Sequence, residues 1–290
     1  MSTIYRIAAV GIFILTIATG CSSLKIVYRQ LDWYIPAYID QYISLEDRQY
    51  RFVEARVDHL LQWHCEKALT EYAIWLETIR SDLLQNRLDL GRIKYLSQQT
   101  DNFWKDIIVN STPSIVEFFT TVSDEQLQQL INKIKERNEE LQNEFVKADR
   151  NRVRSQLAKR MEDRVERWID ELEPGQQQLI AEWSDNAAIG QKLWFENRLK
   201  WQERFFTIIK KHRANPDTLS KELEELFLNP EEYRSPEYRQ HALHYRINIL
   251  ELLNKLILSI TREQRNYMIR TLKNYATDIR ELACVKNIES

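Results

Sequence analysis

The chain has 290 residues, of which 41 are Lys or Arg and 43 are Asp or Glu, so its net charge at pH 7 is −2 with neutral histidines. A surface of mixed sign and near-zero net charge argues against nucleic acid as a partner. Only five residues are glycine, too few for a phosphate-binding glycine loop, a dinucleotide fingerprint or a nucleophile elbow. Enzymes that depend on any of these three motifs are thereby disfavoured. The length of the chain allows one or two domains.

The first residues are typical of a signal for export and lipidation. Arg6 precedes an apolar run over residues 7–17, and small residues then lead to a cysteine in Ala18-Thr19-Gly20-Cys21. The apolar run is too short to cross a bilayer, which takes about 20 residues. We therefore predict a lipoprotein signal peptide over residues 1–20 and an acylated Cys21, with an ordinary signal peptide as the alternative.

The predicted lipid anchor also sets the expected compartment. Ser22 follows the cysteine, where an aspartate would favour retention at the inner membrane of Gram-negative bacteria, so we expect the outer membrane. Multiple acyl chains hold a protein firmly on lipid, which makes the membrane itself a partner. Residues 21–24 are expected to form a short tether, and residues 25–290 a periplasmic domain that lies close to the lipid.

The remainder of the chain is predicted to be all-α. Apolar residues recur at spacings of three and four between abundant Leu, Glu, Lys, Arg and Gln, and no linker rich in Pro, Gly or Ser divides the chain. We expect a single domain of about ten helices, several of them long and amphipathic. The predicted helices lie near residues 25–34, 37–43, 45–86, 90–109, 113–121, 124–172, 175–213, 217–228, 237–259 and 262–283, with a break in the third around residues 66–70.

Capping signatures mark several of the predicted helix starts. Ser123-Asp-Glu-Gln126 and Thr261-Arg-Glu-Gln264 are capping boxes, in which the hydroxyl accepts an amide hydrogen bond and the glutamine reaches back. Glu173-Pro-Gly-Gln176 has the same form, and Ser44-Leu-Glu-Asp47 is expected to open another helix. The stretch after Ser123 is predicted to be one long amphipathic helix, or two nearly collinear ones.

The segment directly behind the anchor is unusually rich in aromatic and acidic residues. Amphipathic aromatic rings favour the headgroup zone of a bilayer, so this segment is a candidate contact for the membrane or for a partner, and packing beneath the helices is the alternative. The candidate contact residues are Asp32, Trp33, Pro36, Tyr38, Asp40 and Tyr42.

Two cysteines remain once Cys21 is acylated. Cys65 and Cys284 are an even pair in a compartment that oxidises thiols, so we expect a disulfide between them. The alternative is two buried free thiols.

Two further patterns suggest binding sites. Trp194 and Trp201 lie two helical turns apart, which predicts either part of the core or an aromatic groove for a peptide, acyl chain or glycan. Glu237, His241 and His244 fall on one helix face at a spacing that suits a divalent metal, although such trios also arise on solvated faces. We expect no cofactor.

Several blocks of residues resemble a family of Gram-negative outer-membrane lipoproteins known only as a domain of unknown function. The resemblance extends over nearly the whole mature chain. It implies a helical lipoprotein with Cys65 paired to Cys284, and it implies no activity. The blocks are Tyr28 to Trp33, Ile35 to Tyr38, Asp40 to Tyr42, Trp63 to Cys65, Arg137 to Phe145, Arg164 to Trp168, Asn197 to Gln202, Pro236 to Tyr238 and Leu282 to Cys284.

These patterns favour a non-enzymatic envelope lipoprotein that offers long helices to a protein partner at the periplasmic face of the outer membrane. The motifs Val122 to Gln126 and Ile260 to Gln264 are also similar to those of the Spy family of periplasmic chaperones, which suggests a chaperone-like version of this role. The alternatives are a carrier of lipid or another hydrophobic ligand, and a metal-dependent hydrolase of the cell envelope around His241 and His244.

Overall fold

The computed structural model describes residues 22–284, and every regular element in that range is a helix, so the predicted all-α class is confirmed. The predicted signal peptide over residues 1–20 and Cys21 lie outside the described residues. Among the helices within this range, none combines the length and apolarity needed to cross a membrane.

The helices follow one another through short turns. Their bounds are α2 Ser22–Tyr28, α3 Leu31–Tyr42, α4 Asp47–Trp63, the π-helix η1 His64–Ala68, α5 Leu69–Leu84, α6 Leu90–Thr121, α7 Asp124–Phe145, α8 Arg150–Ile169, α9 Pro174–Ile189, α10 Gln191–His212, α11 Pro216–Leu228, the 3-10 helix η2 Pro230–Tyr233, α12 Pro236–Ser259 and α13 Arg262–Leu282.

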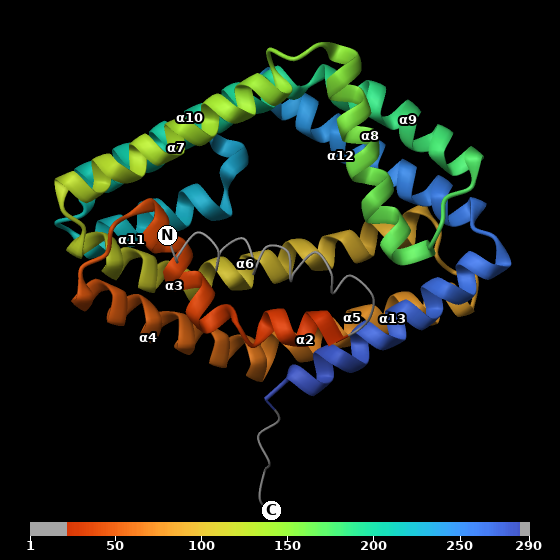
Figure 1. Ribbon diagram of the computed structural model, residues 1–290, viewed down its shortest axis with the longest axis horizontal. Coiled ribbons are helices and arrows are strands. Elements are labelled where there is room, and N and C mark those ends of the chain that lie inside the picture. The colour runs from red at the N-terminus through yellow and green to blue at the C-terminus, as the bar shows by residue number, and fades with distance from the viewer. Residues whose placement is uncertain (1–21, 285–290) are drawn as a thin grey trace, which may run out of the picture.

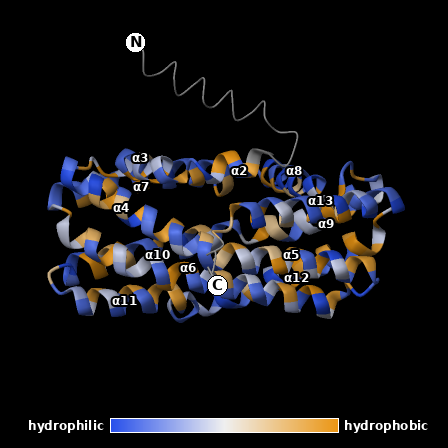
Figure 2. Cartoon of the chain, turned by 90° about the horizontal axis from the view of Figure 1, so that it is seen from below, coloured by the Kyte–Doolittle hydropathy of each residue, from blue (hydrophilic) through white to orange (hydrophobic). Residues whose placement is uncertain are grey.

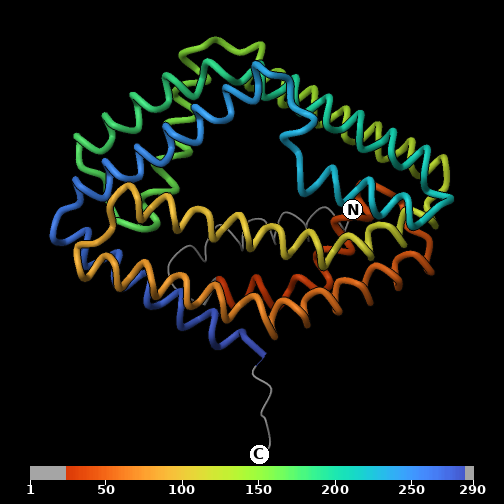
Figure 3. Tube along the Cα trace, turned by 180° about the vertical axis from the view of Figure 1, so that it is seen from behind, coloured from red at the N-terminus to blue at the C-terminus, as the bar shows by residue number. Residues whose placement is uncertain are grey.

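Together the helices form a flattened ring (Figure 1). The helices α7 and α10 run side by side along one part of the ring, α8, α9 and α12 along the next, and α4, α5, α6 and α13 along the third. The short helices α2 and α3 lie across one face, whereas α11 and α12 lie on the opposite face (Figures 2 and 3).

Two opposite corners of the ring are built in the same way. At one corner, Gln126 at the start of α7 donates to Gln49 of α4 (2.7 Å) and to the Ser44 carbonyl (2.8 Å). At the other corner, Gln264 of α13 donates to Gln176 of α9 (2.8 Å) and to the backbone carbonyl that precedes α9 (2.7 Å). Each of the four glutamines is the third residue of its helix and closes a capping box, so one local motif both starts a helix and joins it to a distant helix.

Each half of the ring has its own hydrophobic core. The larger cluster packs the side chains of α5, α8, α9, α12 and α13, with Ile180 and Ala276 fully buried. The second cluster packs α6, α7, α10 and α11 around Ile209, Leu219 and Leu223. Since both cores belong to one continuous ring of helices, the single body that the sequence predicted is confirmed.

Several predicted boundaries are wrong because prolines do not end their helices. Pro36 lies inside α3 and Pro113 inside α6, and the chain turns instead at residues 29–30. A proline inside a helix leaves the carbonyl four residues earlier without its usual donor. These carbonyls belong to Asp32 and Val109, both exposed residues, where water is able to supply the missing hydrogen bond.

Two long predicted helices are in fact pairs of helices that meet at an angle. The stretch predicted over residues 124–172 breaks after Phe145, where Asp149 caps α8, so α7 and α8 are not collinear (Figure 1). The stretch predicted over residues 175–213 breaks at Gly190. Near the predicted break at residues 66–70, the chain forms the π-helix η1 and continues into α5. The cap of α4 is Glu46, which pairs with Gln49, rather than the predicted Ser44.

Candidate ligand-binding cavity

A cavity of about 830 Å³ lies in one half of the ring, among α3, α4, α6, α7, α10, α11 and α12. Its wall is mainly apolar and aromatic. The aromatic lining residues are Tyr38, Tyr42, Phe52, Phe118, Phe119, Trp194, Trp201, Phe205, Phe206, Phe227 and Tyr238. Ligand sites commonly enclose about 300–1,000 Å³ and combine such a wall with a few polar groups, so both the size and the lining fit a ligand site.

The two predicted tryptophans belong to this wall. Trp201 stacks on Phe205 with ring centroids 5.6 Å apart and stacks on Phe227 at 6.0 Å. Trp194 and Trp201 are half-buried and line the cavity from positions two turns apart on α10. Trp201 also packs against the second hydrophobic cluster, so the stripe is core in part, and both rings line the cavity. Whether the aromatic face binds a ligand stays a prediction.

A polar cluster interrupts the aromatic wall. Arg198 lines the cavity from α10, one turn from each tryptophan, and its Nε donates to Oδ1 of Asn138 on α7 at 3.0 Å. Asn138 in turn donates to Oε1 of Gln202 at 2.7 Å. Burial, reinforced by the charge of nearby Arg137, lowers the pKa of the Arg198 guanidinium. Arginine nevertheless stays protonated in proteins, so this cluster places a positive charge in the cavity wall.

Two tyrosines of α3 complete this part of the wall. The hydroxyl groups of Tyr38 and Tyr42 lie 3.2 Å apart, and their rings are tilted with centroids 5.2 Å apart. The hydrogen bond to Tyr42 is the main cause that raises the pKa of Tyr38. Tyr38 is 45% exposed although it lines the cavity. Its ring therefore lies where the cavity meets the surface.

One part of the segment predicted to contact a membrane or partner is packed against the fold, and another part is exposed. Pro36 is buried, whereas Trp33 and Tyr34 are 48% and 49% exposed. Asp32 accepts the backbone N–H of Trp33, and Asp40 accepts that of Leu45 at 2.8 Å, so both carboxylates serve the local backbone. The exposed aromatic part of α3 remains the candidate contact surface.

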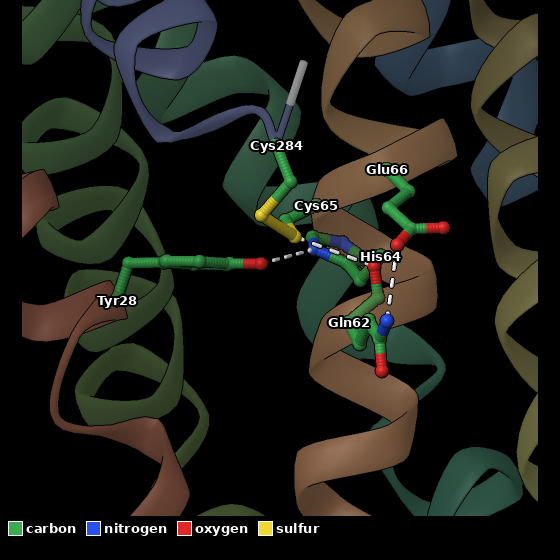
Figure 4. Close-up of a disulfide and its surroundings, with 6 residues drawn as sticks. All are labelled: Tyr28, Gln62, His64, Cys65, Glu66 and Cys284. Carbon is green, nitrogen blue, oxygen red and sulfur yellow. Dashed lines mark hydrogen bonds between the residues drawn. A yellow bond between two sulfur atoms is a disulfide. The ribbon is translucent and has the colours of Figure 1, made fainter. Parts of the chain in front are cut away.

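The predicted disulfide is present, and it joins the π-helix η1 to the segment that directly follows α13. Cys65 and Cys284 are bonded with an S–S distance of 2.06 Å (Figure 4). Tyr28 of α2 lies 3.1 Å from Nδ1 of His64, next to the bridge, and burial lowers the pKa of this imidazole. Lys25 pairs with Asp278 at 3.2 Å and with a glutamate on the same helix. The second half of α2 is thereby held close to the end of α13.

The predicted metal trio does not come together as a site. Glu237 and His244 are exposed on α12, and within residues 22–284 no three His, Cys, Asp or Glu side chains are arranged to hold a metal ion. His241 instead lies over Gly190, where an added Cβ would approach its ring to 1.8 Å. Burial is the main cause that lowers the pKa of His241. Its observed contacts are those of a packing residue.

Sequence reasoning did not single out Arg198, Asn138 or Gln202 as a site. Arg198 lies between Trp194 and Trp201 at helical spacing, and this charged residue within an aromatic stripe was the available signal. Its contact with Asn138 joins residues 60 positions apart, which no local pattern reveals. Several of the blocks that carry the family resemblance nonetheless meet at this cavity.

Comparison with known proteins assigns a family and no activity. No curated protein and no solved structure matches the chain. A family described as "Family of unknown function (DUF6279)" matches residues 41–239, which is more than half of the sequence, while the resembling blocks before and after that range lie outside the match. The chain belongs to this family of unknown function.

Proposed function

We propose that this chain is a non-enzymatic lipoprotein of the outer membrane that faces the periplasm and binds a hydrophobic ligand in the aromatic cavity. The observation that carries the proposal is the cavity of about 830 Å³ with its aromatic wall. Each methylene moved from water into apolar surroundings gains about 0.8 kcal/mol. A chain of about ten methylenes would therefore gain about 8 kcal/mol before the cost of ordering it.

The position of α2 and α3 supports exchange of such a ligand with a membrane. These helices directly follow Cys21, the predicted acylation site, and they expose Ile26, Val27, Trp33 and Tyr34. From Tyr34 a series of rings continues to Tyr38 at 6.0 Å and on to Tyr42 in the cavity wall. Apolar and amphipathic side chains of this kind favour the bilayer interface, so the series offers a path from lipid to cavity.

The scaffold role and its chaperone-like version have less structural support. The capping motifs that resemble those of Spy chaperones contribute Gln126 and Gln264, and both side chains are engaged at the corners of the ring. These motifs are thus accounted for by helix capping and helix pairing. The hydrolase alternative rests on Glu237, His241 and His244, which do not form a joint site. We therefore rank ligand binding first.

A brominated fatty acid tests the proposal directly, because bromine quenches the fluorescence of nearby tryptophans. The full chain would carry Cys21→Ser to keep it free of acyl groups. Ser114→Phe adds a ring at a small residue of the cavity wall, and Ser97→Phe is the matched control, since Ser97 is half-buried on the same helix and does not line the cavity.

We expect saturable quenching in the parent protein and in Ser97→Phe, and little quenching in Ser114→Phe. Circular dichroism and thermal unfolding of the three proteins would verify that each is folded. Absence of saturable quenching in the parent protein, or equal quenching in folded Ser114→Phe, would contradict ligand binding in this cavity.

A further inference from the structure

We propose that Arg198 recognises an anionic headgroup, so that the ligand is an amphiphile with an apolar chain and a terminal carboxylate or phosphate. This inference rests on the proposed function and adds the chemical class of the ligand. It comes from the contrast between a cavity wall that is largely apolar and one guanidinium group within it that is held in place without a carboxylate partner.

The position of Arg198 places charge and apolar surface side by side. Trp194 and Trp201 lie four residues before and three residues after Arg198 on α10, and all three line the cavity. Positions with this spacing share one face of a helix. A ligand whose apolar chain packs on one of these rings can therefore place its end group at the guanidinium.

The guanidinium is oriented by a buried neighbour. Asn138 is only 7% exposed, and its Oδ1 accepts from Nε of Arg198 at 3.0 Å while its amide nitrogen is bonded to Gln202. The Gln202 side-chain amide also lies 3.2 Å from Nη2 of Arg198. Among the residues that the structure describes, no carboxylate forms an ion pair with the guanidinium, so its charge has no counterion there. A planar guanidinium held through Nε is suited to bind two oxygens of one anion with its remaining donors.

The surroundings of Arg198 favour an anion over a neutral or cationic group. Nearby Arg137 adds positive charge, and part of that charge is compensated by Glu140 at 2.5 Å. The hydroxyls of Tyr38 and Tyr42 lie in the same part of the wall and can donate to an oxygen. A half-buried cation without a counterion is unfavourable, and a bound anion would remove that cost.

Arg56 provides a matched comparison within the same cavity. It also lines the wall, but its Nη2 pairs with Glu117 at 2.6 Å and its guanidinium lies over the Phe52 ring. Its charge is already compensated, so Arg56 should contribute little to the choice of headgroup.

The test compares four ligands that share one sixteen-carbon chain: hexadecanoate, hexadecyl phosphate, hexadecanol and hexadecylamine. Their dissociation constants would be measured by calorimetry on the full chain with Cys21→Ser. Hydrogen bonds to charged groups stabilise by more than neutral ones, so we expect one or both anions to bind about tenfold to a hundredfold more tightly than hexadecanol. The ratio between the two anions distinguishes a fatty acid from a lipid with a phosphate headgroup.

Variants identify the residue responsible. In Arg198→Gln the preference for the anion over hexadecanol should fall to about one, because the charge is gone, while hexadecanol itself still binds. Arg198→Lys should keep part of the preference, and Arg56→Gln should keep all of it. Unchanged binding of hexadecanol in each variant would verify that the cavity is intact.

The outcomes separate the two proposals. Equal affinity for the anions, the alcohol and the amine in the parent protein would overturn headgroup recognition and leave the cavity as a site for apolar ligands. A preference that persists in Arg198→Gln would equally overturn the assignment to Arg198. Failure of all four compounds to bind would contradict the proposed function itself.

Discussion

Replacing Gln264 with alanine should destabilise the protein more than the same change at Gln126, although the two side chains form equivalent hydrogen bonds. Gln264 donates to the Glu171 carbonyl and accepts from the Thr261 N–H, and it exchanges two bonds of 2.8 Å with Gln176. Gln126 makes the corresponding four bonds at the opposite corner of the ring.

Burial distinguishes the two glutamines that are replaced, although Gln49, the partner of Gln126, is itself only 6% exposed. Gln264 is 5% exposed and its partner Gln176 is 1% exposed, whereas Gln126 is only half-buried. A buried polar group that loses its partner costs about 1–3 kcal/mol, but water replaces the partner where it has access. In Gln264→Ala, the side-chain oxygen of Gln176 would still accept from the Glu173 N–H, and its side-chain nitrogen would still donate to the Ser259 carbonyl. These two bonds limit the loss of stability. We expect about 3 kcal/mol for Gln264→Ala and about 1 kcal/mol for Gln126→Ala.

Urea unfolding followed by circular dichroism measures both values as changes in the free energy of unfolding. Gln177→Ala is the control, because Gln177 is exposed on the same helix as Gln176, and a change within about 0.5 kcal/mol is expected there. The reasoning is refuted if Gln126→Ala costs as much as Gln264→Ala, or if neither variant costs more than the control.

Three further predictions concern single contacts. Gly190→Ala should cost about 1–3 kcal/mol, because the new Cβ would meet the His241 ring, whereas Gly175→Ala, with nothing within 4 Å, should cost nothing; thermal unfolding compares them. Reducing the disulfide should lower the Tm by on the order of 10 °C, because the bond closes a loop across a sequence separation of 219 residues, and an unchanged Tm would contradict this. Burial lowers the pKa of His64 below its ordinary 6.5, so the unfolded state binds the proton more readily, and stability present at higher pH should be lost as the pH falls through 6.5. His64→Gln should weaken this pH dependence, and His59→Gln, at an exposed position, should leave it unchanged.

The helical architecture was predictable because its signals are local. Three- and four-residue periodicity and the capping boxes at Ser123, Glu173 and Thr261 place helix starts close to those of the structure. The same signals failed at Pro36 and Pro113, because whether a proline ends a helix depends on access of water to the carbonyl that it leaves unpaired. That access is a property of the folded surface.

The corner pairs show where local reasoning ends. The boxes predict that each glutamine reaches back to its own helix start, but not that Gln49 meets Gln126 across 77 positions or that Gln176 meets Gln264 across 88. These pairings depend on how the ring closes. The contribution of each glutamine pair to stability therefore depends on tertiary contacts, which helix propensity does not reveal.

The candidate site was predictable in part. The tryptophan spacing suggested an aromatic face, and Tyr38 and Tyr42 were selected as contact residues, and all of them line the cavity. Arg198 was missed because the role proposed for it depends on its contact with Asn138 of another helix and on the absence of a paired carboxylate among the described residues. The metal site predicted at Glu237, His241 and His244 was wrong because helical spacing alone does not make side chains converge on one ion.

The most direct test of the central claim is to identify the lipid that accompanies the protein out of the membrane. The acylated full chain and its Ser114→Phe variant would be extracted from cells in parallel, and noncovalently bound lipid would be measured by mass spectrometry per mole of protein. Ligand binding in the cavity predicts about one apolar or amphiphilic molecule per parent chain and a marked loss in folded Ser114→Phe. Equal and substoichiometric amounts in both proteins would contradict the account.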